Sequence, residues 1–451
     1  MSGEQDRDIV WTFARRRRLG GAAAAVLILV TLLAVRRPIE RAQPAEPSAG
    51  YPTPESAARG GPLSVTLVVT PAPRSSTRAP TATPAPPTTA TVPAVGPAYR
   101  PGFNPLTGLP VSDPQTLLTV PLLVSITEFP PSARPQSGLS AASQVWETSI
   151  GEGMSRFLAV YYGDYQAVLA KLLESHPKLT TSDPAIGPIR SGRVGYQEIK
   201  LFYPGALLII RFGSPEVIEQ LTNSRTVYAD DPNDVNSASL TLAELQALEL
   251  DPARPSSYAG LSFDPRVPAG GVPSASLDLI YSLYNQIRWE YDADRGTYLR
   301  SQDRADGSGA MVPSFDRLSD DRLQADNVLV FFAEHKYQNL QGTVLSIELA
   351  YVPKRYGLLF RDGRQFEIQW SSRGLEFRVQ DDQGRPVPLR PGVTFFEVVS
   401  YESSWDPAAR IVRFHNPPLP TLTMTLTPTP TATITPSATE SAAPPPGTAT
   451  P

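Results

Sequence analysis

Hydrophobic and polar positions alternate in short runs between residues 121 and 163. The run PLLVSITE at 121–128 has the length of a buried strand, and QVWETSI at 144–150 has the two-residue period of a second strand. After the turn signal GEG at 151–153, MSRFLAVYYG at 154–163 continues as a mostly apolar strand. The pattern predicts one strand followed by a hairpin with glycine at its turn.

Helical and strand patterns then mix. DYQAVLAKLLESH at 164–176 has helical spacing of its apolar residues, and VGYQEIKLFYPG at 194–205 reads as a helix that Pro204 ends. ALLIIRFG at 206–213 is a candidate buried strand, and SPEVIEQL at 214–221 begins with Ser and Pro, as many helices do. This mixture predicts an α/β or α+β arrangement for the first half.

The second half is dominated by strand patterns that are separated by Asp-Gly or Gln-Gly turns, which is typical of antiparallel hairpins. The segments are 285–302, 327–337, 343–352, 356–370, 375–389 and 394–400. The predicted fold class is therefore α+β, with a mixed α/β N-terminal part followed by a mainly antiparallel β C-terminal part.

The N-terminus carries a candidate membrane segment. Four arginines at 15–18 precede LGGAAAAVLILVTLLAV at 19–35, which is short for a membrane span but longer than the apolar core of most signal peptides. We expect an uncleaved signal anchor with residues 1–18 in the cytoplasm and the folded body outside the cell membrane. The alternative is a cleaved secretory peptide.

Proline-rich segments flank the body. Residues 44–101 hold 14 of the 49 prolines and residues 417–451 hold 10, mixed with Thr, Ala and Ser, so these segments are expected to be disordered spacers. The predicted organisation is a linker at 36–101, an N-terminal domain at 102–250, a connecting segment at 251–276, a C-terminal β domain at 277–402 and a disordered tail at 403–451.

Composition excludes several classes of function. The whole chain has a formal net charge of −4, and residues 1–41 have a net charge of +4, so residues 42–451 have a net charge of −8. An acidic body argues against nucleic-acid binding, which needs a cationic surface for the phosphates. The chain has no cysteine, which excludes disulfides, thiolate chemistry and lipid attachment through a cysteine. Its three histidines, His176, His335 and His415, are scattered, so a histidine-rich metal site is not expected. We expect no metal and no cofactor.

The stretch AIGPIRSGR at 185–193 is the strongest candidate for ligand binding. Ser191 is placed to cap the helix that follows, and Arg190 and Arg193 could grip a carboxylate or a phosphate. The alternative is that Arg190 pairs with a carboxylate of the protein itself.

Two carboxylates stand in the predicted hairpin. Glu147 and Glu152 could be the acid and base of glycoside cleavage, but an ion pair of Glu147 with Arg156 or Arg190 is the favoured interpretation. Arg134 and Ser137 belong to a polar loop that follows the first strand, where function is common. No His or Lys stands near Ser137 in sequence, so we do not expect a nucleophilic serine.

Several segments together resemble the YerB-like lipoprotein family, a bacterial domain of unknown function with N-terminal and C-terminal parts. They include NPLTGLPV at 104–111, ARPQSGLSAASQVWETSIGEGMSRFLAVYYG at 133–163, IGPIRSGR at 186–193 and GLLFRDGRQFEIQW at 357–370. The resemblance covers about 102–400 and implies a cell-envelope protein of two linked parts. It brings no known reaction, substrate or catalytic residue.

The chain departs from this family in two ways. Members are usually lipoproteins, whereas this chain has no cysteine, so the segment at 19–35 would replace the lipid anchor. The usual Pro-His-x-Asp stretch corresponds to VPSFD at 312–316, without the histidine.

The polar loops that match the family best lead to a hypothesis about the site. They hold Arg134, Ser137, Glu147, Glu152, Arg156, Arg190, Ser191 and Arg193, which we expect to converge on one cleft. We expect a membrane-anchored extracytoplasmic binding or regulatory protein that acts with the cell wall or its synthesis machinery. The alternatives are an envelope hydrolase that uses Glu147 or Glu152, and a stalked structural surface protein.

Overall fold

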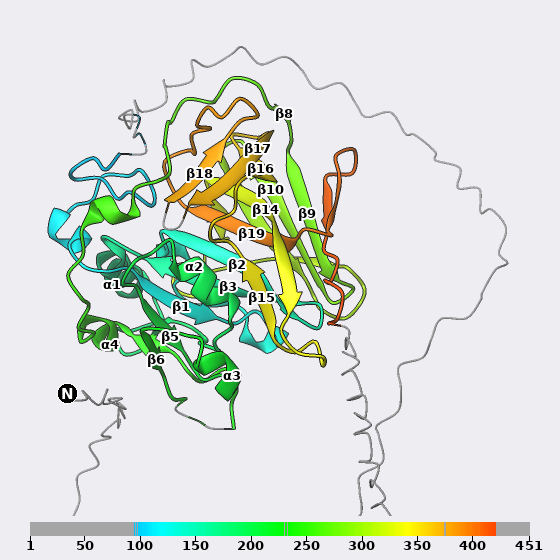
Figure 1. The fold of residues 1–451 in the computed structure, drawn as a ribbon. Helices are drawn as coiled ribbons and strands as arrows, with labels where there is room; N and C mark the ends of the chain where they lie inside the picture. The colour runs from blue at the N-terminus through cyan, green and yellow to red at the C-terminus, as the bar shows by residue number, and fades with distance from the viewer. Residues whose placement is uncertain are drawn as a thin grey trace, which may run out of the picture. The chain divides into compact units, whose positions relative to one another are not determined.

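The computed structural model describes residues 94, 96, 98–229, 231, 233–373 and 376–420. Within them the largest element is a mixed 12-stranded sheet (Figure 1). Its main path runs in the order β18 (Glu376–Gln380), β17 (Arg364–Arg373), β16 (Arg355–Arg361), β14 (Asn327–Tyr337), β19 (Thr394–Ser400), β2 (Gln144–Gly151), β3 (Met154–Tyr161), β1 (Leu122–Ile126), β5 (Leu207–Ile210) and β6 (Ser224–Thr226). Two short strands join it at the side, β15 (Leu345–Glu348) on β14 and β8 (Val272–Pro273) on β17.

A second sheet has seven strands and comes from the C-terminal half alone. Its path is β12 (Met311–Pro313), β11 (Thr297–Asp303), β10 (Asn285–Asp292), β9 (Ser276–Ser282), β21 (Ile411–Arg413) and β20 (Ser404–Asp406), and β13 (Gln324–Ala325) pairs with β11. A small two-stranded sheet joins β4 (Pro184–Ile186) to β7 (Leu240–Thr241).

The helices of the described chain are short. They are α1 (Tyr165–Ser175), α2 (Gly195–Lys200), α3 (Pro215–Ile218) and α4 (Leu242–Gln246), with 3₁₀ turns at Pro114–Leu117, Pro131–Ala133, Leu139–Ala141 and Pro255–Tyr258. The β-rich character that we predicted is confirmed, but the N-terminal part is not clearly α/β. The reason is that β1, β2 and β3 pair antiparallel, so few helices are needed to connect parallel strands.

The large sheet is a central layer with a hydrophobic core on each face. One core joins Val145 and Phe157 to residues of the second sheet, such as Trp289, and to Leu169 of α1. The other core packs Trp146 on the opposite face, and α2 contributes Tyr196 and Ile199 to it. Both cores contain residues from both halves of the chain, so the halves share their cores.

Strand β19 joins the two halves. It pairs parallel with β14 on one side, where Phe395 faces Val328, and parallel with β2 on the other, where Glu397 faces Glu147. A strand from near the end of the folded chain therefore lies in the middle of the large sheet (Figure 1).

Local patterns predicted several elements well. The strand at 121–128, the hairpin at 144–163 and the helix at 164–176 are confirmed as β1, β2–β3 and α1. The folded body extends past residue 402, the end that we predicted for it, because Trp405 and Val412 carry the apolar faces of β20 and β21 into the first core.

The predicted membrane segment at 19–35 lies outside the described residues. Among the described residues, no helix combines the length and the hydropathy that crossing a bilayer requires.

Candidate functional site

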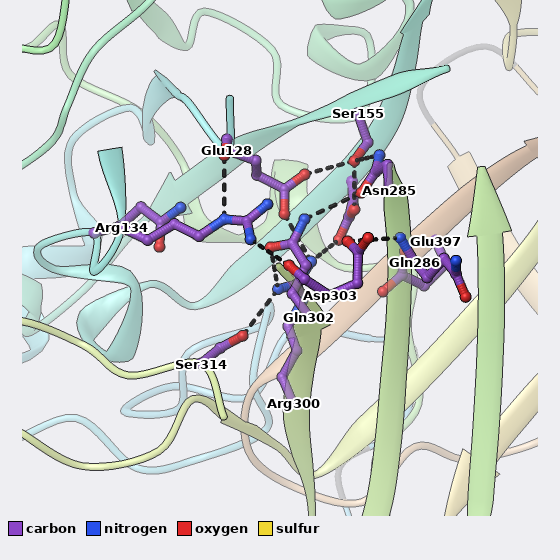
Figure 2. A network of polar contacts seen from close by, with 12 residues as sticks. Glu128, Arg134, Ser155, Asn285, Gln286, Arg300, Gln302, Asp303, Ser314 and Glu397 are labelled. Carbon is purple, nitrogen blue, oxygen red and sulfur yellow. Dashed lines mark hydrogen bonds and ion pairs between the residues drawn. The ribbon is translucent and has the colours of Figure 1, made fainter. Parts of the chain in front are cut away.

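A buried network of polar side chains lies between the two large sheets, with Arg300 at its centre (Figure 2). One terminal nitrogen of Arg300 in β11 donates to Glu128 Oε1 at 2.7 Å and to Glu147 Oε2 at 2.9 Å. The side chain of Arg300 is 1% exposed and those of both glutamates are fully buried. The second terminal nitrogen donates to Gln302 Oε1 and Ser314 Oγ, both at 3.1 Å.

Ser155 of β3 links the two glutamates. Its hydroxyl oxygen lies 2.6 Å from Glu128 Oε2 and 2.7 Å from Glu147 Oε1, and it also accepts a hydrogen bond from Asn285 at 2.9 Å. A hydroxyl has only one hydrogen to donate, so it can serve one carboxylate at a time. The second short contact places another buried carboxyl oxygen against the same hydroxyl group, so Glu128 and Glu147 compete for one donor.

The electrostatics agree with this reading. Burial, and then the charge of Glu128, raise the pKa of Glu147 well above its ordinary value. Burial also raises the pKa of Glu397, a third carboxyl group in the network, to about 7. Glu397 of β19 accepts a hydrogen bond from Trp289 Nε1 at 2.9 Å.

Arg300 is the cation that holds these groups together. Burial alone would lower the pKa of Arg300, but the charges of Glu147, Glu128 and Glu397 raise it above its ordinary value. The network thus joins β2, β11 and β19 from opposite sheets and both halves of the chain. Arg134 lies at its rim, where it donates to the carbonyl oxygens of Asp303 at 2.7 Å and Glu128 at 3.3 Å.

These contacts correct the expected partner of Glu147. We predicted an ion pair of Glu147 with Arg156 or Arg190. In the structure Glu147 instead forms its ion pair with Arg300, which lies 153 residues away in sequence. The reason is the direction of the side chains. Glu147 pairs with Phe157 across the hairpin and points towards the second sheet, whereas Arg156, the residue before Phe157, points to the opposite face, towards the loop at 187–193.

That loop gathers a second group of charges, which we call the arginine cluster: Arg156, Arg190, Arg193 and Arg211. Each side chain donates to backbone carbonyl oxygens, and none makes an ion pair with a carboxylate of the described residues. Burial, and then the charge of Arg193, lower the pKa of Arg156 to about 9. Burial, and then the charges of Arg211 and Arg193, lower the pKa of Arg190 as well.

Ser191 does not cap a helix as predicted. Helix α2 begins later, at Gly195, with Val194 before it and no side-chain cap, because residues 190–192 run extended beside β5 instead. The Ser191 carbonyl oxygen accepts hydrogen bonds from Arg156 and from the hydroxyl group of Ser125. Ser191 therefore contributes its backbone to the arginine cluster.

The remaining candidates lie in three different environments. Glu152 is exposed at the hairpin turn, while Glu147 is buried inside the network. Ser137 exchanges backbone hydrogen bonds with Gly187, so the loops at 134–138 and 187–193 are in contact. Whether all eight candidate residues line one cleft stays a prediction.

Asp316 fixes the loop that holds Ser137. Its carboxylate accepts hydrogen bonds from the backbone nitrogens of Gly138 at 3.1 Å and Ser140 at 2.7 Å. Gly138 has a φ of 85°, and a Cβ atom there would lie 2.4 Å from the Ala185 carbonyl oxygen, so only glycine fits this position.

No metal centre is found in the part of the chain that the structure describes: no group of three or more His, Asp or Glu side chains is placed to hold an ion. The buried network instead places the guanidinium group of Arg300 near three carboxyl groups, those of Glu128, Glu147 and Glu397, and all of them are closed to solvent.

Two models of known domain families match successive parts of the chain. "Protein of unknown function (DUF3048) N-terminal domain" matches residues 106–241, and the corresponding C-terminal domain matches residues 277–396. The chain belongs to the DUF3048 family. The resemblance drawn from the sequence is thereby confirmed.

This DUF3048 chain is similar to the YerB protein of Bacillus subtilis both in sequence and in structure. A protein of Bacillus subtilis (strain 168), named YerB and described as a lipoprotein by prediction, is 25% identical over 322 residues, or 65% of this chain and 85% of the relative. A crystal structure of the YerB protein from Bacillus subtilis has a TM-score of 0.49 at 22% identity, covering 66% of this chain and 96% of that one. The family description states no function, so function has to be argued from the site.

The sequence patterns of this DUF3048 chain did not reveal Glu128, Arg300, Glu397 or Arg211. The sequence did contain a signal for Arg300. In β11, Leu299 and Ser301 point to one face of the strand, while Arg300 points to the same face as Tyr298, which packs into the core. A charged residue on such a face must find a buried partner. Its partners, however, come from distant strands that local patterns do not identify.

Proposed function

We propose that this chain is an extracytoplasmic binding module of the bacterial cell envelope that holds an anionic ligand at the arginine cluster. One observation carries the proposal: four guanidinium groups lie together, partly or wholly buried, without an ion pair to any described carboxylate. Buried charges are costly unless they are compensated. A bound anion would supply the missing compensation.

Two further points support its proposed place in the envelope. The relative YerB is named as a lipoprotein, which is a protein attached to the outer face of the membrane. This chain has no cysteine to carry a lipid, and we propose that the apolar segment at 19–35 anchors it instead. The cell wall and the proteins that synthesise it are the partners within reach of such an anchor.

The geometry favours binding over cleavage. A general acid or base must reach the bond that it cleaves. Glu147 is fully buried and held by Arg300 and Ser155, while Glu152 lies on an exposed turn. The two carboxyl groups thus lie in different environments, which supports a binding role without turnover.

The test is co-sedimentation with purified bacterial cell wall. Both hydrophobic cores lie within residues 106–414, so a fragment covering 94–420 keeps every described core contact. We expect this fragment to sediment with the wall, and the double variant Arg156→Met with Arg193→Met to lose binding. The variant Arg304→Met, which removes an exposed arginine, is the matched control.

The same samples test the alternative. Soluble material is measured over time in the supernatant of the parent fragment and of Glu147→Gln. Release by the parent that the variant abolishes would overturn the proposal and make the chain a hydrolase.

A further inference from the structure

We infer that the arginine cluster binds the phosphate group of a lipid, with the apolar part of the lipid lying on Phe212, Ile218, Tyr228 and Val235. This rests on the proposed function and deepens it by naming the class of ligand. The inference comes from the arrangement of the guanidinium groups, from their uncompensated charge, and from the apolar side chains beside them.

The backbone brings the arginines together. Residues 190–192 lie between β1 and the end of β5: the amide of Arg190 donates to Ser125, that of Arg211 donates to Arg190, and that of Gly192 donates to Phe212. Arg190 and Arg211 then share one acceptor, the carbonyl oxygen of Val235, at 3.0 and 2.5 Å. The cluster is therefore fixed by the fold.

The guanidinium groups keep free donors. Arg156 donates to the Ser191 carbonyl oxygen at 3.0 Å and Arg193 to the Gly192 carbonyl oxygen at 2.8 Å, out of five N–H donors each. Arg156 is only 4% exposed, and its Nε, like that of Arg190, is buried without a partner in the described chain. Buried donors of this kind are normally satisfied, so these two point to an acceptor that a ligand supplies.

The balance of charge selects the class of anion. Four cations face two carboxylates: Glu152 lies within electrostatic reach of Arg193, and Glu128, which already pairs with Arg300, lies within reach of Arg156. A single carboxylate would leave most of this charge uncompensated. A phosphate monoester carries up to two charges and three acceptor oxygens, and arginine matches it with paired hydrogen bonds.

Apolar side chains adjoin the cluster. Phe212 and Tyr228 are 53% and 62% exposed, and Val235 and Ile218 are 45% and 37% exposed. The Arg211 guanidinium lies 5.4 Å from the centre of the Phe212 ring. The amide of Val227 donates to the carbonyl oxygen of Ile210 at the end of β5, so Tyr228 follows directly after a residue that is paired with this strand. An exposed apolar patch beside a cationic cluster fits a ligand that is both anionic and apolar.

A membrane lipid meets both requirements. The probe is a phosphatidylcholine vesicle that contains phosphatidic acid, a phosphate monoester lipid. Vesicles with the same mole fraction of phosphatidylserine, and vesicles of phosphatidylcholine alone, are the comparisons. The fragment covering 94–420 is used, so that the membrane segment does not contribute, and inorganic phosphate is tested separately by its effect on the melting temperature.

We expect co-sedimentation with phosphatidic acid vesicles and a stabilising effect of phosphate. The Arg156→Met with Arg193→Met variant should lose both, by about tenfold or more in affinity, as expected for lost charge-assisted hydrogen bonds. Phe212→Ser should weaken vesicle binding but leave the effect of phosphate unchanged. Arg304→Met should change neither.

Three other results would each overturn the inference. Equal binding to phosphatidylserine vesicles would show attraction to any anionic membrane. Stabilisation by phosphate without vesicle binding would reject the lipid while the anion-binding function stands. No effect of phosphate and no vesicle binding would reject the lipid. If the parent fragment also failed to sediment with the cell wall, the proposed function would be rejected as well.

Discussion

The buried carboxyl group of Glu397 should make the stability of this protein depend on pH in an unusual direction. Burial raises its pKa from 4.5 to about 7 in the folded protein. Between these two values the folded state keeps the proton, whereas the unfolded state releases it. The contribution of Glu397 to the free energy of unfolding is therefore largest below pH 4.5, and it falls as the pH rises towards 7.

The size of the effect follows from the two pKa values. A difference between 4.5 and about 7, at about 1.4 kcal/mol for each pKa unit, amounts to about 3 kcal/mol. Glu147, whose pKa is also raised, adds a loss of the same sign. The change Glu397→Gln removes the titrating group but keeps an oxygen that can accept the hydrogen bond from Trp289.

The assay is urea unfolding at a series of pH values between 4.5 and 8. As the pH rises across this range, titration of the network should lower the free energy of unfolding of the parent by about 3 kcal/mol or more. In Glu397→Gln the corresponding decrease should be smaller by about 3 kcal/mol. Glu290→Gln, which changes an exposed residue of β10, is the control and should follow the parent. If Glu397→Gln kept the full pH dependence of the parent, the reasoning from burial would be wrong.

Three further predictions concern the network, a loop and the arginine cluster. Arg300→Met leaves the buried carboxyl groups of Glu128 and Glu147 without their ion-pair partner and should cost about 3–5 kcal/mol in urea unfolding. Arg295→Met removes an exposed ion-pair residue and should cost less than about 1 kcal/mol. Gly138→Ala forces a Cβ atom against a backbone carbonyl oxygen and should lower stability by about 2 kcal/mol or more, whereas Gly102→Ala, which has a positive φ but open space, should cost about 1 kcal/mol. Arg156→Met removes a buried charge that lacks a carboxylate partner, so without ligand it should leave the melting temperature unchanged or raise it; a clear fall would mean that Arg156 has a structural partner.

Local patterns revealed those parts of the fold that local physics determines. The hairpin at 144–163 has both its strand alternation and its glycine turn within twenty residues, so the sequence contains the whole signal. The helix at 194–205 was predicted too long, because the extended residues 190–192 and the packing of Tyr196 and Ile199 set where α2 begins and ends. Tertiary contacts outweighed propensity there.

The site was only partly accessible to the same reasoning. The loop at 185–193 stood out because arginines, a serine and glycines occur together, and the structure does place three of the candidate arginines in one cluster. The partners of Glu147 could not be found, since Arg300 and Glu397 reach it from strands that are distant in sequence. Pairing between distant strands leaves no local periodic signal.

The central position of β19 has a consequence for how this chain can acquire its structure. The strand is among the last parts of the body to be synthesised, yet β2 and β14 both need it as a hydrogen-bonding neighbour. Pairings between such distant segments have high contact order and form slowly. During synthesis the edge of β2 that pairs with β19 would therefore stay unprotected until residue 400 had been made. Cutting the chain between the two family domains should yield two pieces that fold poorly alone, and such a protein would depend on extracytoplasmic folding helpers more than its two-domain sequence suggests.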